Sequence, residues 1–89
     1  LLADGELTIQ TQAYGGFEQV GALPQSLTAD DAQMTTEPGD IVLYNSNSIV
    51  FFYGANSWSY TKLGYMTNFD AAADALLRAD SVTVTLSLA

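Results

Sequence analysis

Hydrophobic and polar residues alternate along two segments, one near each end of the chain. In Glu6–Ala13 the odd-numbered residues share one face, and in Ser81–Leu88 valine and leucine alternate with serine and threonine. The residues expected on the inner faces are Leu7, Ile9, Thr11, Ala13, Val82, Val84, Leu86 and Leu88. A period of two is typical of strands that bury one face. The pattern therefore predicts a half-buried strand in each segment.

Shorter apolar segments predict three further strands in the middle of the chain, Ile41–Tyr44, Ser48–Tyr53 and Trp58–Leu63. Turn-forming residues precede and separate them at positions 38–40, 45–47 and 54–57. Alternation in the second segment sends Ile49, Phe51 and Tyr53 to one face and Val50 and Phe52 to the other. We expect one of these sets to fill the core and the other to face outward or into a groove.

The remaining segments predict a loop and a helix. Residues 21–38 are polar, contain both prolines and lack a sustained period, so we expect a long loop with at most a short helical turn. Asn68 is a suitable cap for a helix over Phe69–Leu77, and Arg78 follows near its end. The whole pattern thus predicts a single, mainly β domain with about five strands and one helix.

Charge and composition exclude several classes of function. The chain has 89 residues and a net charge of −8, with Lys62 and Arg78 as its only cations. Such a field repels phosphate backbones, so we expect no nucleic-acid partner. No apolar stretch approaches the roughly 20 residues of a membrane span. The compartment stays undetermined, because a chain without cysteine suits either side of a membrane.

The same composition argues against a metal centre and against covalent catalysis. Cysteine and histidine are both absent, which removes the thiolate ligands and the commonest general base. Asp30 and Asp31 lack the alternating carboxylates of a calcium loop. Carboxylates at Glu18, Glu37 and Asp40 lie near glycine-rich bends, where they more often form turns than an acid–base pair. We therefore expect no cofactor, no metal and no catalytic residue.

Aromatic residues are concentrated around two glycine bends. Tyr14 and Phe17 flank Gly15-Gly16, and a second group surrounds Gly54. That second group contains Phe51, Phe52, Tyr53, Trp58 and Tyr60. Trp58 and Tyr60 share one strand face, so they are candidates for a partly exposed shelf that binds an extended peptide or a small ligand. Phe51 and Phe52 fit a core position better.

Three segments resemble the bacterial cyclophilin-like proteins, which are small β-barrels related in fold to the cyclophilins. They are AYGGFEQVGALPQSL, TTEPGDIVLYNSNSIVFFYGANSWSYTKLG and SVTVTLSL, and the resemblance extends from Leu7 to Leu88. It implies a partly closed, eight-stranded barrel with one short helix near the C-terminus. Because members of this family begin with a further hairpin and the chain starts at Leu1, it also implies that residues 1–89 are one domain without its N-terminal strands.

The missing hairpin has a consequence for the last strand. In the family, Ser81–Leu88 would pair with the absent first strand, so its apolar edge would be open here. Open edges of this kind favour aggregation or strand exchange. We therefore expect another chain, another copy or a further segment to cover this edge.

The resemblance also permits a comparison with the cyclophilin active groove. The segment Gly15–Val20 resembles the groove stretch that follows the catalytic arginine, and this places Gln12 at the position of that arginine. Phe17, Phe52 and Trp58 resemble the hydrophobic floor, and the groove histidine has no counterpart. Glu18 would give the groove the opposite electrostatic character. Loss of the arginine should cost an isomerase orders of magnitude in rate.

These comparisons favour a non-catalytic binding domain that holds a peptide or small molecule in an aromatic groove. The predicted ligand-binding residues are Gln12, Tyr14, Phe17, Glu18, Phe52, Trp58 and Tyr60. One alternative is a weak or altered peptidyl-prolyl isomerase. Another is a structural module that assembles through the Ser81–Leu88 edge.

Overall fold

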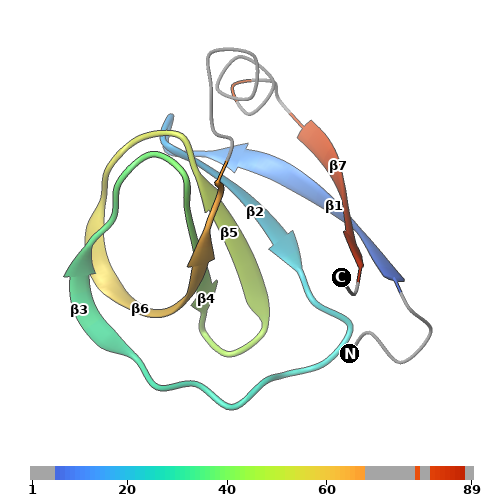
Figure 1. Cartoon of the computed structure of the whole chain (residues 1–89), viewed down its shortest axis with the longest axis horizontal. Helices are drawn as coiled ribbons and strands as arrows, with labels where there is room; N and C mark the ends of the chain where they lie inside the picture. Colours follow the sequence, from blue (N-terminus) through green and yellow to red (C-terminus); the bar gives the residue numbers. More distant parts are fainter. Residues whose placement is uncertain (1–5, 68–77, 79–80, 88–89) are drawn as a thin grey trace.

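A computed structural model describes residues 6–67, 78 and 81–87, which form one antiparallel sheet (Figure 1). The strands are β1 (Glu6–Tyr14), β2 (Glu18–Ala22), β3 (Ala32–Thr35), β4 (Asp40–Tyr44), β5 (Ser48–Phe52), β6 (Ser57–Tyr65) and β7 (Ser81–Ser87). Their order across the sheet is β3-β6-β4-β5-β2-β1-β7. The predicted mainly β class is confirmed.

The sheet curls strongly without closing. Figure 1 shows β3, β6 and β4 bending round one side of the molecule, while β1 and β7 extend away from them on the other. A register shift between Ile41 and Val42 in the pairing of β4 with β6 accompanies this curl. Bulges of this kind increase the local twist of a sheet. The terminal strands β3 and β7 do not pair with each other among the described residues, so the barrel is partial.

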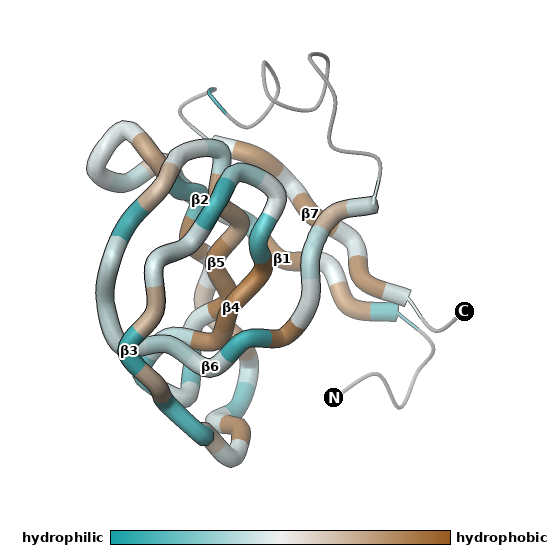
Figure 2. The backbone as a smooth tube through the Cα atoms, turned by 60° about the vertical axis from the view of Figure 1, so that its left-hand side comes forward, coloured by the Kyte–Doolittle hydropathy of each residue, from teal (hydrophilic) through white to brown (hydrophobic). Residues whose placement is uncertain are grey.

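Both faces of the central strand β5 are buried. Ile49, Phe51 and the following Tyr53 pack in one cluster with Ile9 of β1. Val50 and Phe52 pack in a second cluster with Val42 and Tyr60. Figure 2 shows the hydrophobic positions concentrated on β4 and β5 at the centre of the molecule. The two sets face opposite sides of β5, as the alternation predicts, and the curled sheet buries both of them.

The loop predicted over residues 21–38 is partly wrong. Its start belongs to β2, and Ala32–Thr35 forms β3, which pairs antiparallel with β6. Within β3 only Met34 packs against a buried cluster. A four-residue edge strand with one inward apolar side chain gives no period to recognise, because its conformation depends on pairing with a distant strand.

The helix predicted over Phe69–Leu77 lies outside the described residues, and the described part of the chain contains no helix. β7 was expected to have an open edge. One of its edges pairs with β1 along its whole length, from Gln12 opposite Ser81 to Glu6 opposite Ser87. Its outer edge has no strand partner among the residues described. The expectation that something covers this outer edge stays a prediction.

Candidate ligand pocket

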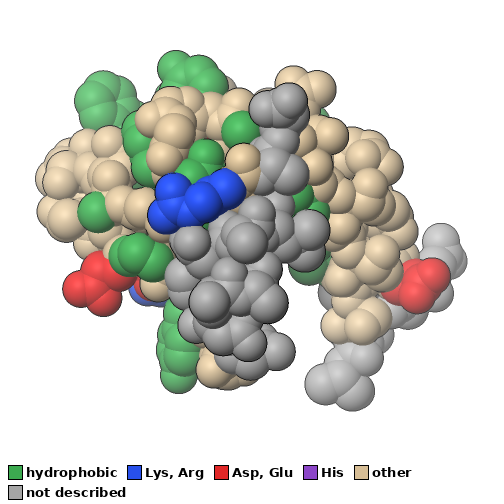
Figure 3. All heavy atoms as spheres, turned by 90° about the horizontal axis from the view of Figure 1, so that it is seen from above, with side chains coloured by type: hydrophobic (Ala, Val, Ile, Leu, Met, Phe, Trp, Pro, Cys, Tyr) green, Lys and Arg blue, Asp and Glu red, His purple; other side chains and the backbone are tan. Residues whose placement is uncertain are grey.

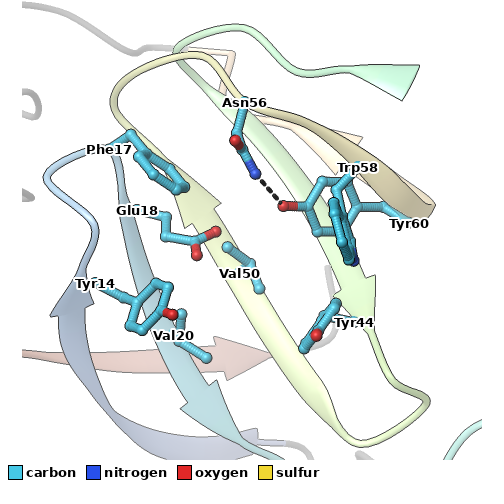
Figure 4. A pocket seen from close by; sticks show the side chains of 9 residues that line it. All are labelled: Tyr14, Phe17, Glu18, Val20, Tyr44, Val50, Asn56, Trp58 and Tyr60. Carbon is cyan, nitrogen blue, oxygen red and sulfur yellow. Dashed lines mark hydrogen bonds between the residues drawn. The ribbon is translucent and has the colours of Figure 1, made fainter. Parts of the chain in front are cut away.

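A pocket of about 490 Å³ lies on the side of the sheet that carries Val50 and Phe52. Its lining comes from β1, β2, β4, β5, β6 and the turns that join them (Figure 4). The lining residues are Tyr14, Phe17, Glu18, Val20, Tyr44, Val50, Asn56, Trp58 and Tyr60. The curl of the sheet brings β1 and β2 to one side of the pocket and β6 to the other.

Phe17 fixes one end of this pocket by joining the two glycine bends. Gly15 and Gly16 have φ values of 66° and 75°, which L side chains rarely adopt, so the turn after β1 depends on glycine. The amides of Tyr53 and Gly54 both donate hydrogen bonds to the Phe17 carbonyl, over 2.9 and 3.0 Å. The two bends that the sequence singles out are therefore one structural unit.

Four aromatic rings form a continuous series beneath and beside the pocket. Phe17 stacks on Phe52 with ring planes 7° apart and centroids at 6.3 Å. Phe52 meets Tyr60 edge to face at 5.5 Å, and Tyr60 meets Tyr44 edge to face at 6.0 Å. Such pairs contribute about 0.5–1.5 kcal/mol each beyond their burial. The rings therefore hold the pocket wall in a defined shape.

Hydrogen bonds fix the polar end of the Tyr60 side chain. The Asn56 side-chain amide donates to the Tyr60 hydroxyl over 2.8 Å, as Figure 4 shows. The backbone of Asn56 is held in turn by Thr36, whose buried hydroxyl and amide both bond to it. Burial raises the pKa of the Tyr60 hydroxyl above its usual value. Tyr60 is therefore a fixed, neutral part of the wall.

Among the described residues, Glu18 is the only aspartate, glutamate, lysine or arginine in the lining. It is 6% exposed, and its Oε2 atom has no hydrogen-bond partner. Its strand neighbours are Tyr14 on β1 and Phe52 on β5, which lie directly opposite it in register. Burial in these surroundings raises the pKa of its carboxyl to about 7. Figure 4 shows this carboxyl directed into the pocket between the two walls.

The rim of the pocket is exposed and aromatic. Trp58 is 56% exposed and Tyr14 is 66% exposed, and they belong to opposite walls. Aromatic side chains with large open faces supply apolar contact area together with polar tips. The pocket therefore combines a rigid floor with rings at its mouth that are free to contact a ligand.

The cations of the described residues lie outside the lining. The Lys62 ammonium group bonds to an Asp40 carboxylate oxygen at 2.8 Å. The Arg78 guanidinium stands 5.2 Å from the centroid of the Tyr53 ring, and Tyr53 belongs to the cluster with Ile9. In Figure 3 the coloured charged side chains are few and scattered, without a broad basic surface on that face.

Comparison with known proteins identifies the family. The model of the cyclophilin-like family matches residues 1–87. The chain belongs to the cyclophilin-like family. No curated protein and no solved structure matches it. In this cyclophilin-like domain, the described residues include no helix long and apolar enough to cross a membrane and no acidic cluster suited to a metal ion.

The structure brings together most of the residues that the sequence selects in this cyclophilin-like domain. Five of them line the pocket, namely Tyr14, Phe17, Glu18, Trp58 and Tyr60. Phe52 lies behind the lining, fully buried between Phe17 and Tyr60. Tyr60, expected to be partly exposed, is 3% exposed, because its ring packs on Phe52 and its hydroxyl is bonded to Asn56.

Gln12 does not join this set. It pairs with Val20 on the next strand, so it shares the pocket face but lies beyond the lining. Its side chain borders a neighbouring depression that also contains Tyr14 and Val20. The position that resembles the catalytic arginine of cyclophilins therefore stands outside the pocket of this domain.

Sequence reasoning missed four lining residues, Val20, Tyr44, Val50 and Asn56. Two of them could have been predicted, because residues two apart on a strand share a face. Val20 stands two residues from Glu18, and Val50 stands two residues from Phe52. Tyr44 and Asn56 carry no such signal. They reach the pocket through the pairing of β4 with β6 and through the Thr36 contact, which only the folded chain reveals.

Proposed function

We propose that this cyclophilin-like domain is a non-catalytic binding module that holds a small ligand or a peptide side chain in its aromatic pocket. The observation that carries the proposal is the pocket itself, about 490 Å³ in volume with mainly apolar walls and few polar groups. Ligand sites of proteins usually have volumes of about 300–1,000 Å³ and this kind of lining. The fixed rings of Phe52 and Tyr60 also limit the ordering cost on binding.

Binding is favoured over prolyl isomerisation because the electrostatic element of isomerisation is missing from the lining. In the cyclophilin groove that this chain resembles, the positive charge of an arginine stabilises the twisted amide of the transition state. The described lining offers instead the acidic Glu18. A proline-peptide isomerisation assay at high protein concentration should show no acceleration. An acceleration that disappears in a pocket variant would contradict the non-catalytic assignment.

The proposal is tested with two neutral aromatic probes, 2-phenylethanol and N-acetylphenylalaninamide, titrated into ¹⁵N-labelled protein. The chain has a single tryptophan, so the indole N–H signal of Trp58 reports on the pocket directly. Saturable shifts should be confined to this signal and to amides around the pocket. Dissociation constants of about 1 mM are expected for ligands of this size.

A matched pair of variants separates the pocket from general aromatic exposure. Trp58→Ala removes a ring at the mouth of the pocket, whereas Tyr65→Ala removes one that is 67% exposed and outside the lining. Trp58→Ala should weaken probe binding several-fold, and Tyr65→Ala should leave it unchanged. Equal effects of the two substitutions, or no saturable binding by either probe, would refute the proposed function.

A further inference from the structure

The Glu18 carboxyl is buried without the partners that a buried acid ordinarily has. It is 6% exposed and its Oε2 atom accepts no hydrogen bond. An unpaired polar atom in an apolar site costs about 1–3 kcal/mol, and more when the group is charged. Glutamine or an apolar residue on β2 would avoid much of this cost. The carboxyl is thus a buried acceptor, and the described part of the chain supplies no donor to its Oε2 atom.

The groups that face Glu18 from neighbouring elements are aromatic. Tyr14 stands opposite it on β1 and Phe52 on β5, and Tyr60 of β6 is close enough for the two acidic groups to interact electrostatically. Tyr44 of β4 completes the titratable groups of the lining. All three tyrosines contribute phenol hydroxyls to the lining, and none contributes a cation. As far as the structure describes the chain, the lining therefore holds one carboxyl and no compensating charge.

The surrounding rings and the charge of the chain both favour a cation. Ring faces attract ammonium groups by about 0.5–2 kcal/mol, and four aromatic side chains other than Phe17 line this pocket. The net charge of −8 also raises the local concentration of cations. An anionic ligand would be repelled both by the Glu18 carboxylate and by the net negative charge of the chain.

We propose that the pocket selects a protonated amine carried on an apolar body, with an N–H of the amine donating to the Glu18 carboxylate and the body lying among Tyr44, Trp58 and Tyr60. This inference rests on the proposed binding function and specifies its ligand class. Charge-assisted hydrogen bonds of this kind are roughly twice as strong as neutral ones. Glu18 is then the residue that sets specificity, while the rings supply most of the contact area.

Ligand binding should be coupled to the protonation of Glu18. Burial raises the pKa of its carboxyl to about 7, so the acid is half ionised at neutral pH. An ammonium ligand binds the ionised form and must compete with a proton below this value. Between pH 8 and pH 6 the ionised fraction falls about tenfold, and the affinity for the amine should fall with it. Binding should release a proton near neutral pH.

The experiment compares 2-phenylethylammonium with its neutral analogue 2-phenylethanol, by NMR titration at pH 8 and pH 6. The amine stays protonated at both values, as alkylamines do. At pH 8 the amine should bind at least about tenfold more tightly than the alcohol. Its affinity should fall about tenfold at pH 6, whereas that of the alcohol should change little.

Two charge-neutralising variants provide the control. Glu18→Gln keeps the shape of the side chain and should remove both the preference for the amine and its pH dependence, while the alcohol still binds. Glu37→Gln removes the same charge from an exposed position outside the lining and should change neither. If Glu18→Gln does not fold, ¹³C titration of the Glu18 carboxyl in the unmodified protein should show its pKa falling when the amine is added.

The outcomes separate this inference from the function on which it rests. If the alcohol binds and the amine binds no better, the pocket is a binding site but the proposed ligand class is wrong. If affinity for N-acetylphenylalaninamide rises as the pH falls, Glu18 serves as a protonated donor to carbonyl groups, and the inference is overturned. If neither the amine nor a neutral probe binds, the proposed function fails as well.

Discussion

Phe17 and Gly54 are in direct backbone contact where the two glycine bends meet. The Gly54 amide donates to the Phe17 carbonyl over 3.0 Å, and a Cβ on Gly54 would lie 2.9 Å from the Cβ of Phe17. Phe17 also requires glycine at position 15, because a Cβ there would lie 2.5 Å from the Phe17 ring. One aromatic residue thus imposes glycine on both bends, and the end of the pocket depends on that contact.

Gly54→Ala should destabilise the domain, because the added methyl group meets a backbone-proximal carbon that cannot rotate away. Overpacking of this kind typically costs about 1–3 kcal/mol. Gly64→Ala is the control, since a Cβ there has no heavy atom within 4 Å. Urea denaturation should show a lower midpoint for Gly54→Ala and an almost unchanged one for Gly64→Ala. Equal urea midpoints for the two variants would mean that the stability of the domain does not depend on the close contact between the two bends.

Phe52→Ala should remove the centre of the aromatic series. Phe52 is fully buried and contacts Phe17 on one side and Tyr60 on the other. Truncation of a buried phenylalanine costs about 3–5 kcal/mol. Phe52→Leu retains most of the volume and should cost clearly less in the same thermal or urea unfolding measurement. A loss of under about 1 kcal/mol for Phe52→Ala would show that the series does not support the wall.

Thr11→Val should reveal the cost of a buried hydroxyl that joins three strands. Thr11 Oγ1 lies 3.0 Å from Gln19 Oε1 on β2 and 2.8 Å from the Val82 carbonyl on β7. Valine keeps the shape but removes these contacts, which should cost about 1–3 kcal/mol. Thr83→Val is the matched control, because its hydroxyl bonds to Gln10 on the exposed face. A similar, small effect of both substitutions would contradict this role.

The stability of the ligand-free domain should fall as the pH rises from about 4.5 to 7. Burial raises the pKa of Glu18 from 4.5 to about 7, so the folded state binds more protons than the unfolded state between these values. The free energy of unfolding therefore decreases from about pH 4.5 to pH 7 and stays lower above it, by roughly 3 kcal/mol.

Urea unfolding at pH 5 and pH 8 measures this change. Glu18→Gln should remove the Glu18 contribution and be more stable than the unmodified protein at pH 8. If the two proteins lose stability equally between these pH values, Glu18 is not the responsible group, and its carboxyl is better solvated than the structure indicates.

Most of the correct sequence predictions came from the alternation of side chains between the two faces of a strand. The alternation in Glu6–Ala13 and Ser48–Tyr53 identified real strands and divided the side chains of β5 between two faces correctly. This alternation is a local property, since it depends only on the extended backbone. It does not reveal the curl of the sheet, and for this reason the burial of both faces was not predicted.

Long-range pairing explains what the sequence did not reveal. β3 forms because it pairs with β6. Gln12 lies two residues before Tyr14 on β1, and the lining reaches Tyr14 but not Gln12. The aromatic composition of the site was predictable, because the rings cluster around glycine bends in the chain itself. The isolation of Glu18 was not, since burial of a carboxyl depends on which walls surround it.

The double-sided packing of β5 also bears on how this domain can change over evolutionary time. From Ile49 to Tyr53 five consecutive side chains are 5% exposed or less. In an ordinary half-buried strand every second residue faces solvent and can be exchanged with little effect on stability. The segment from Ile49 to Tyr53 has no such position. Divergence within the segment should therefore be restricted to exchanges among apolar residues of similar size, and mutational scanning should find five adjacent intolerant codons there.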